Sequence, residues 1–176
     1  AVENHASLES DMRHAIQDNQ LHLYYQIQMD DQQRAIGAEA LIRWIHPVRG
    51  MVSPAQFIPI AEESFLISDI GHWVLNTACQ QLQLWQQQAE TRHLTLAVNV
   101  SAPQFMQHDF VENVLQLIKR YQINPKLLKL ELTEAVVLDD VTDIINKMNA
   151  LKVSGIRLSL DDFGTGYSSL AYLKKL

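Results

Sequence analysis

Two periodicities of apolar residues alternate along most of the chain. A spacing close to that of a helix predicts amphipathic helices within 8–16, 70–85, 110–121 and 141–151. Shorter apolar or alternating runs predict strands at 21–29, 35–45, 94–101, 127–133 and 156–160. Strands that alternate with helices of this length indicate βα units around a parallel sheet, which forms either a barrel or an open doubly wound sheet.

The connections refine this picture at three places. Only residues 30–34 join the first two predicted strands, and this link is too short for a parallel crossover, so we expect an antiparallel pair. Gly155 is the expected stop of the last complete helix. Residues 1–10 are expected to be a segment that connects an upstream domain to the first helix.

The last three predicted strands divide their residues by parity, and successive strand residues point to opposite faces of a sheet. One parity holds Leu94, Leu96, Val98, Leu128, Leu130, Leu132, Ile156, Leu158 and Leu160. The other holds Thr95, Ala97, Asn99, Lys129, Glu131, Thr133, Arg157, Ser159 and Asp161. An open sheet covered by helices on both faces would be apolar on both parities. The split favours a barrel with helices only outside, and a sheet with one wet face is the alternative.

Composition narrows the function classes. The chain has 176 residues, of which 47% are hydrophobic and 19% charged, as is typical of one soluble globular domain or part of one. A net charge of -6 argues against a nucleic-acid polymer as partner, because such a partner requires a basic surface. The single cysteine excludes a disulfide framework and fits a reducing compartment, and no apolar run is long enough to span a membrane. We therefore expect a cytoplasmic domain.

Asp161 and Asp162 are adjacent at the end of the fifth predicted strand. Like charges at this distance make each other harder to ionise unless a positive group, most simply a divalent cation, lies beside them. A solvated turn that uses aspartate hydrogen bonds is the alternative reading of this pair alone.

Further oxygen donors fall at matching positions. Asn99, Glu131 and Asp161 lie at or near the carboxyl ends of their strands, where barrel active sites are built, and Glu39 fits the same scheme. Three carboxylates and an amide, without paired histidines or cysteines, suit Mg²⁺ or Mn²⁺. Asp162 offers a ligand for a second ion.

The arrangement favours metal-assisted phosphoester hydrolysis, in which two ions activate a water and neutralise the phosphodiester. Arg43, on the face of Glu39, could hold a phosphate oxygen in its planar fork. Two alternatives stay open at this point: a metal-dependent barrel of the enolase type, and a glycosidase that uses two acids without metal.

A family resemblance separates these alternatives. Several motifs are similar, in the right order, to those of the EAL domain family of cyclic di-GMP phosphodiesterases. They are Glu39-Ala40-Leu41-Ile42-Arg43-Trp44, His46-Pro47 with Gly50, the stretch 54–62, Asn99-Val100-Ser101, Glu131-Leu132-Thr133-Glu134, and the stretch 161–170. The likeness runs from about Leu8 to Leu176, although Ile27 stands where the family usually has proline.

The resemblance implies a (β/α)₈-like TIM-type barrel with an antiparallel first strand. It implies that Glu39, Asn99, Glu131 and Asp161 bind one Mg²⁺ or Mn²⁺ and Asp162 a second, so that cyclic di-GMP is opened to linear pGpG. Calcium typically inhibits such enzymes. Arg43 and Gln26 would contact phosphates or bases, Leu41 would pack beside the ligand, and Glu134 would anchor the loop 163–169.

The expected domain is incomplete, because such a barrel takes about 250 residues and these 176 hold about five strands. The family's lysine and glutamate near the metals would follow Leu176, so this stretch alone is expected to be inactive. A GGDEF or sensor domain upstream, in a protein that other parts could anchor to a membrane, is a further expectation. The sequence leaves open a homodimer, and a noncatalytic receptor or docking module is the alternative to the enzyme.

Overall fold

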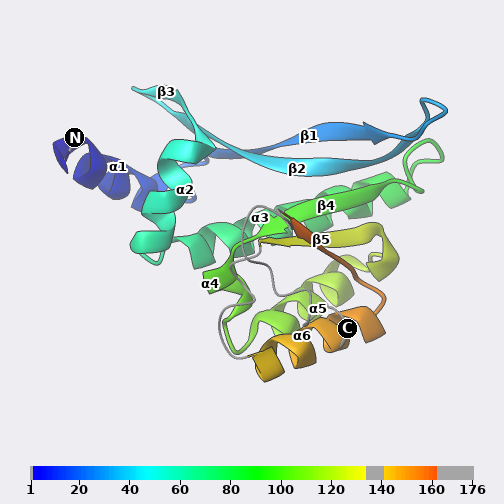
Figure 1. Ribbon diagram of the computed structural model, residues 1–176. Coiled ribbons are helices and arrows are strands. Elements are labelled where there is room, and N and C mark those ends of the chain that lie inside the picture. Colours follow the sequence, from blue (N-terminus) through cyan, green and yellow to red (C-terminus); the bar gives the residue numbers. More distant parts are fainter. Residues whose placement is uncertain (1, 134–140, 162–176) are drawn as a thin grey trace.

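A single mixed sheet organises the computed structural model, which describes residues 2–133 and 141–161 (Figure 1). Its strand order is β1-β2-β4-β5-β6. The bounds are β1 Leu21–Met29, β2 Ala35–His46, β4 Thr95–Val100, β5 Leu128–Thr133 and β6 Arg157–Asp161. β1 is antiparallel to β2, whereas β2, β4, β5 and β6 are parallel neighbours. The five predicted strands and the antiparallel first pair are thus confirmed.

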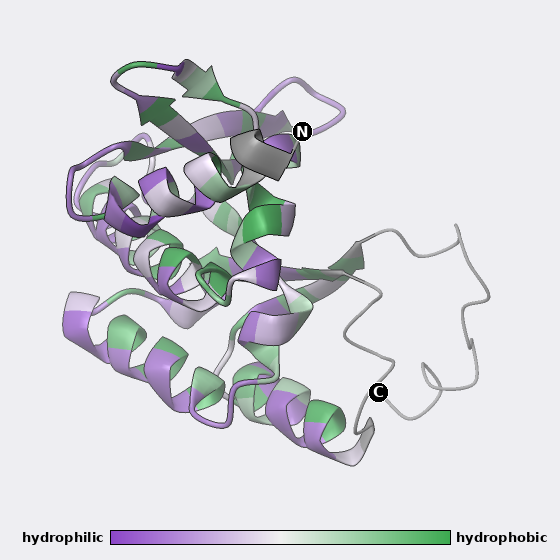
Figure 2. Ribbon diagram, turned by 90° about the vertical axis from the view of Figure 1, so that its left-hand side faces the viewer, coloured by the Kyte–Doolittle hydropathy of each residue, from purple (hydrophilic) through white to green (hydrophobic). Residues whose placement is uncertain are grey.

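Helices cover one face of this sheet. They are α3 (Ile67–Gln86), α5 (Phe110–Tyr121) and α6 (Val141–Val153). In Figure 1, α5 and α6 lie below the strands, and α3 runs behind β4. Their residues are mixed in hydropathy, as expected of amphipathic helices (Figure 2). Gly155 has a φ of 95°, and the amide of Ile156 donates to the carbonyl of Leu151 at 3.1 Å, which ends α6 as predicted.

Several short elements had not been predicted from the periodicity. They are β3 (Gly50–Val52), α2 (Pro54–Glu63), α4 (Ala102–Phe105) and the 3₁₀ turn η1 (Pro125–Leu127). α2 had a readable signal, because Ser53 precedes a proline at the first turn and its amide donates to Gln56 Oε1 at 3.4 Å. β3 and α4 span only 3 and 4 residues, which is too short for a period to show.

The expectation for residues 1–10 needs a correction. α1 (Val2–Ala15) includes most of this segment, so it is helical rather than an irregular connection. Leu8, Met12 and Ala15 are buried at helical spacing, and these contacts fix the register of the whole helix.

The predicted division between the two faces is present. Leu96, Val98, Leu128, Leu130 and Leu132 are each 0% exposed and belong to the hydrophobic core under the helices. On the other parity Asn99 and Arg157 are exposed, and Glu39, Lys129 and Glu131 are half-buried. The polar side chains therefore gather on the face that the helices do not cover.

Candidate functional site

Two predicted ligand residues meet on the polar face. Asn99, near the end of β4, donates from Nδ2 to Oε1 of Glu39 on β2 at 2.8 Å, although 60 positions separate them. Glu131 on β5 is the register partner of Asn99. The sheet thus brings two carboxylates and an amide onto one face, and Asn99 and Glu131 lie toward the carboxyl ends of parallel strands, the usual place for a barrel active site.

Glu131 lies deeper than Asn99. Its side chain is 12% exposed, and its Oε1 accepts from the ammonium of Lys129 at 2.6 Å. The hydroxyl of Ser159 on β6 donates to the same oxygen at 3.5 Å. The sequence pattern placed Lys129 on this face without assigning it a role. Lys129 and Glu131 can make contact because residues two positions apart on a strand point to the same face.

The remaining predicted ligands are only partly visible. The backbone of Asp161 ends β6, opposite Thr133 in the register, and its side chain lies outside the described part of the chain. Asp162 and Glu134 lie outside the described residues altogether. Within 2–133 and 141–161, no group of three or more histidine, cysteine, aspartate or glutamate side chains could hold a metal ion. The donors that are described, all oxygens, nevertheless fit a hard divalent cation.

The predicted substrate residues line the same face. Gln26 on β1 is the register partner of Glu39, and Leu41 and Arg43 follow along β2. The guanidinium carbon of Arg43 lies 5.8 Å from the ring centroid of Tyr24, and its Nη1 donates to the carbonyl of Ile42 at 3.0 Å. This stacking limits how Arg43 can turn, and Tyr24 is a neighbour that sequence reasoning missed.

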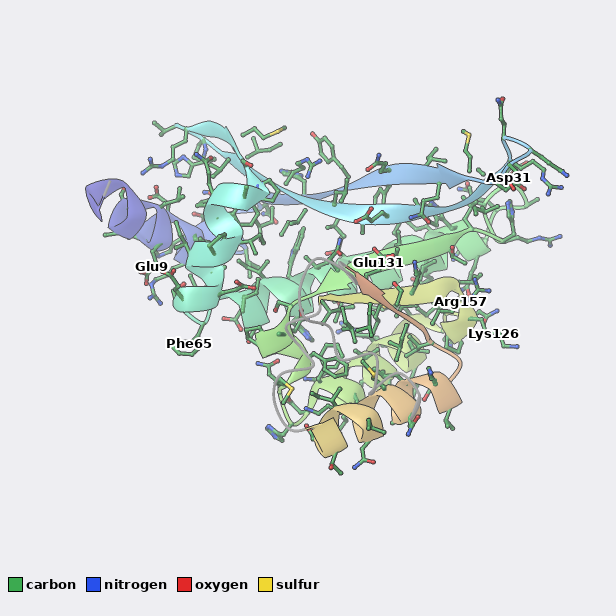
Figure 3. The ribbon with its side chains drawn as sticks, in the orientation of Figure 1. Glu9, Asp31, Phe65, Lys126, Glu131 and Arg157 are labelled. Carbon is green, nitrogen blue, oxygen red and sulfur yellow. The ribbon has the colours of Figure 1, made fainter. Side chains whose placement is uncertain are left out.

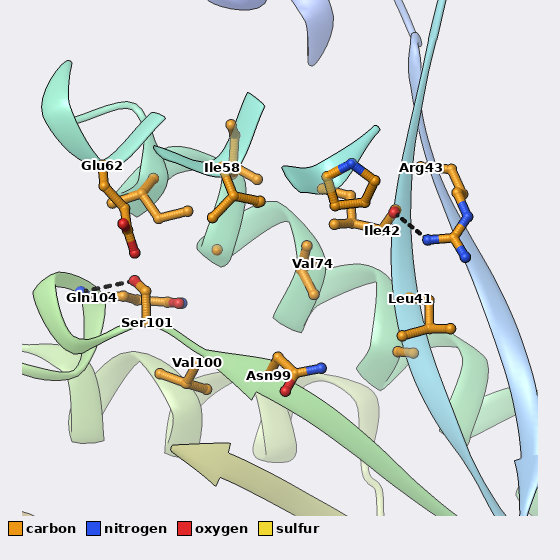
Figure 4. Close-up of a pocket in the computed structure, with 15 residues that line it drawn as sticks. Leu41, Ile42, Arg43, Ile58, Glu62, Val74, Asn99, Val100, Ser101 and Gln104 are labelled. Atoms are coloured by element: carbon orange, nitrogen blue, oxygen red, sulfur yellow. Dashed lines mark hydrogen bonds between the residues drawn. The ribbon is translucent and has the colours of Figure 1, made fainter. Parts of the chain in front are cut away.

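A cavity of about 260 Å³ adjoins these residues (Figure 4). Leu41, Arg43 and Asn99 contribute to its wall, together with residues of α2, α3 and α4. Most of the wall is apolar, and the polar groups are few. The full lining is Ala40, Leu41, Ile42, Arg43, Pro54, Ile58, Glu62, Ile67, Ile70, Gly71, Val74, Asn99, Val100, Ser101 and Gln104. Such a wall suits a flat, largely apolar group held by a few polar contacts.

Gln104 is the unexpected member of this wall. It is 4% exposed, and its side-chain amide makes no hydrogen bond with any residue in the described part of the chain. The amide rests on Gly71 of α3, where a methyl group would come within 2.4 Å of its atoms. The amide lines the cavity, so a ligand there that offers a donor or an acceptor could form a hydrogen bond with it. Local sequence patterns do not reveal such burial.

The lone cysteine takes no part in this site. Cys79 lies on α3, is 1% exposed, and burial raises the pKa of its thiol to about 12. A thiol in this environment stays protonated and does not act as a nucleophile near neutral pH.

No helix within the described residues combines the length and apolar character that a membrane span needs.

The parallel strands, their outer helices and the polar strand ends define an α/β domain of the TIM-barrel type. A model of the EAL domain family matches residues 9–176, and the chain belongs to this family. Both the fold and the family inferred from the sequence are confirmed.

Two relatives from Pseudomonas aeruginosa illustrate the match. The bifunctional diguanylate cyclase/cyclic di-GMP phosphodiesterase MucR is 42% identical over 167 residues, which are 94% of this chain and 24% of MucR. A cyclic di-GMP phosphodiesterase is 41% identical over 156 residues, which are 88% of this chain and 26% of that protein. The chain therefore spans about a quarter of the length of these relatives.

Solved structures agree with this assignment. The complex of the MucR phosphodiesterase with cyclic di-GMP has a TM-score of 0.90 and 42% identity, over 97% of this chain and 69% of that one. The EAL enzyme Bd1971, in a form with cAMP and cyclic di-GMP bound, has a TM-score of 0.91 and 33% identity, over 99% of this chain and 48% of that one. The described strands thus superpose on EAL domains.

Proposed function

We propose that the protein is a metal-dependent phosphodiesterase that hydrolyses cyclic di-GMP to linear pGpG. The observation that supports this most is the contact between Asn99 and Glu39, with Glu131 beside Asn99 in the register. Family membership and the names of the relatives agree with it. The fold alone would not select this reaction, because barrels of this type host many chemistries.

The ligand set is part of the same proposal. Glu39, Asn99, Glu131 and Asp161 would hold one Mg²⁺ or Mn²⁺, and Asp162 would hold a second. Bound there, the ions would activate a water and neutralise charge on the phosphodiester. The oxygen donors of the described residues and the carboxyl-end position on parallel strands support this assignment.

The chain's other residues would bind and orient the dinucleotide. Arg43, stacked on Tyr24, keeps guanidinium hydrogens for a phosphate oxygen, and Gln26 lies beside Glu39 for a further polar contact. Leu41 would pack against the ligand, and Glu134 would anchor the loop 163–169. The adjoining cavity is smaller than the roughly 300–1,000 Å³ that whole drug-sized ligands occupy. We assign it to one guanine base, with Gln104 as a polar contact to that base.

The whole protein is part of the proposal as well. MucR is named as a bifunctional cyclase and phosphodiesterase, and this chain covers only 24% of it. We propose that α1 continues from an upstream GGDEF or sensor domain and that this domain works in the cytoplasm. The buried, protonated thiol of Cys79 is compatible with that compartment.

Turnover of cyclic di-GMP by the full-length protein tests the proposal. With Mn²⁺, linear pGpG should accumulate, and replacing Mn²⁺ by Ca²⁺ should stop the reaction while binding persists. Chromatography of the nucleotides measures both results. Intact cyclic di-GMP after a long incubation with Mn²⁺, together with tight binding, would instead show a noncatalytic receptor.

A further inference from the structure

An ammonium group lies inside the proposed metal site. Lys129 and Glu131 occupy the same face of β5, and Nζ of Lys129 is 2.6 Å from Oε1 of Glu131. The side chains are 32% and 12% exposed, so this pair is less hydrated than an ordinary surface ion pair. Figure 3 shows Glu131 at the sheet, with Arg157 at the start of β6 and Lys126 on η1 away from it.

The register places Lys129 among the ligand residues rather than beside them. Lys129 is the register partner of Ala97 on β4, and Ala97 is the register partner of Glu39 on β2. Ala97 is 1% exposed and offers neither charge nor a polar side-chain atom that could screen one residue from the other. Lys129 and Glu39 therefore lie two strands apart in the same register row, and only a small apolar side chain separates them.

We propose that Lys129 sets the metal affinity of this site, because its ammonium competes with a divalent cation for the Glu131 carboxylate. The inference rests on the proposed function, which makes Glu131 a ligand. A divalent ion held by Glu131 would share this carboxylate with Lys129, and the ammonium would repel the ion. Lys129 thus weakens metal binding and keeps Glu131 paired when the metal leaves.

Direct binding of Mn²⁺ alone to the full-length protein tests this role without any turnover. Electron paramagnetic resonance of free Mn²⁺ gives the dissociation constant. Lys129→Met removes the charge and keeps the chain length, and Lys129→Gln also keeps a hydrogen-bond donor. Both variants should bind Mn²⁺ roughly three- to tenfold more tightly than the wild-type protein.

Two control variants separate this effect from a general change of charge. Lys129→Arg keeps the positive charge at the site and should stay within about twofold of the wild-type affinity. Lys126→Met removes the same charge from an exposed position on η1 and should also stay within about twofold, because solvent screens it. Thermal unfolding of each variant shows whether it is folded. If one of the two neutral variants, Lys129→Met or Lys129→Gln, does not fold, the other still tests the proposal.

The outcomes distinguish the two proposals. If the wild-type protein binds Mn²⁺ and Glu39→Ala does not, but both neutral variants bind with unchanged or weaker affinity, Lys129 is a support for Glu131 and our inference is wrong. If Mn²⁺ binding is absent from the wild-type protein, or is unaffected by Glu39→Ala, the metal site of the proposed function is wrong and the inference falls with it.

Discussion

The two faces of the sheet use the same strands for different purposes. On the face covered by helices, leucines and valines of β4 and β5 are fully buried, and one is much like another in chemistry. On the opposite face most side chains are polar or charged, and Glu39, Asn99, Lys129 and Glu131 form specific contacts. The comparison teaches that the side chains of one face stabilise the fold while those of the other form the candidate site. The two sets stay separate because successive strand residues point to opposite faces of the sheet.

The largest expected effect separates the faces directly. Glu39→Ala should reduce turnover of cyclic di-GMP on the order of a thousandfold or more, because the proposed metal loses a ligand. The melting temperature should change little, since Glu39 contributes to no part of the hydrophobic core. Steady-state kinetics and thermal unfolding of the full-length protein measure the two effects. Glu112→Ala, an exposed carboxylate on α5, is the matched control. Retained turnover would disprove the ligand role.

The converse experiment targets the helix-covered face. Leu130→Ala should lower the free energy of unfolding by about 2–5 kcal/mol, because it opens a cavity at a position that is 0% exposed. Turnover per folded molecule should stay close to wild type. Urea unfolding and active-site titration measure these quantities. Arg157→Ala, exposed on the polar parity of β6, should cost no more than about 0.5 kcal/mol. An equal cost at both positions would refute the division between the faces.

The helix layer also predicts an effect of pH. Burial raises the pKa of Cys79 from 9.0 to about 12, so the folded protein keeps this proton after the unfolded chain has lost it. Stability is therefore complete below pH 9 and falls as the pH rises toward 12, by about 1.4 kcal/mol per unit from this group. Denaturation curves at pH 8, 9 and 10 measure the slope, and Cys79→Ala should flatten it. An unchanged slope in that variant would assign the effect to other groups.

A smaller effect is expected where the two layers meet. Gln104→Leu should weaken binding of cyclic di-GMP about fivefold, because the buried amide would lose a ligand contact worth about 1 kcal/mol. Binding in Ca²⁺, measured by calorimetry, avoids turnover. Gln116→Leu on the exposed face of α5 is the control, since this glutamine bonds only to Glu112 among the described residues. Equal affinities for all three proteins would remove Gln104 from the base site.

Much of the fold follows from local patterns. Strand positions, the antiparallel first pair and the division of polar and apolar residues were predictable, because each depends on a short stretch of chain and on the two-residue period. The extension of α1 back to Val2 was not predicted, because the apolar spacing that indicates this helix begins only at Leu8. The short elements β3 and α4 were missed because they contain less than one useful period.

The amino-acid sequence by itself determined the family, the order of the strands along the chain and the face on which each candidate residue lies. The tertiary structure alone decided which of these residues touch: Asn99 reaches Glu39, Lys129 holds Glu131, and Gln104 rests on Gly71. Periodicity is a property of neighbours in the chain, whereas a contact depends on how separate strands and helices are offset in space. That offset results from packing of the whole core, and no short motif contains it.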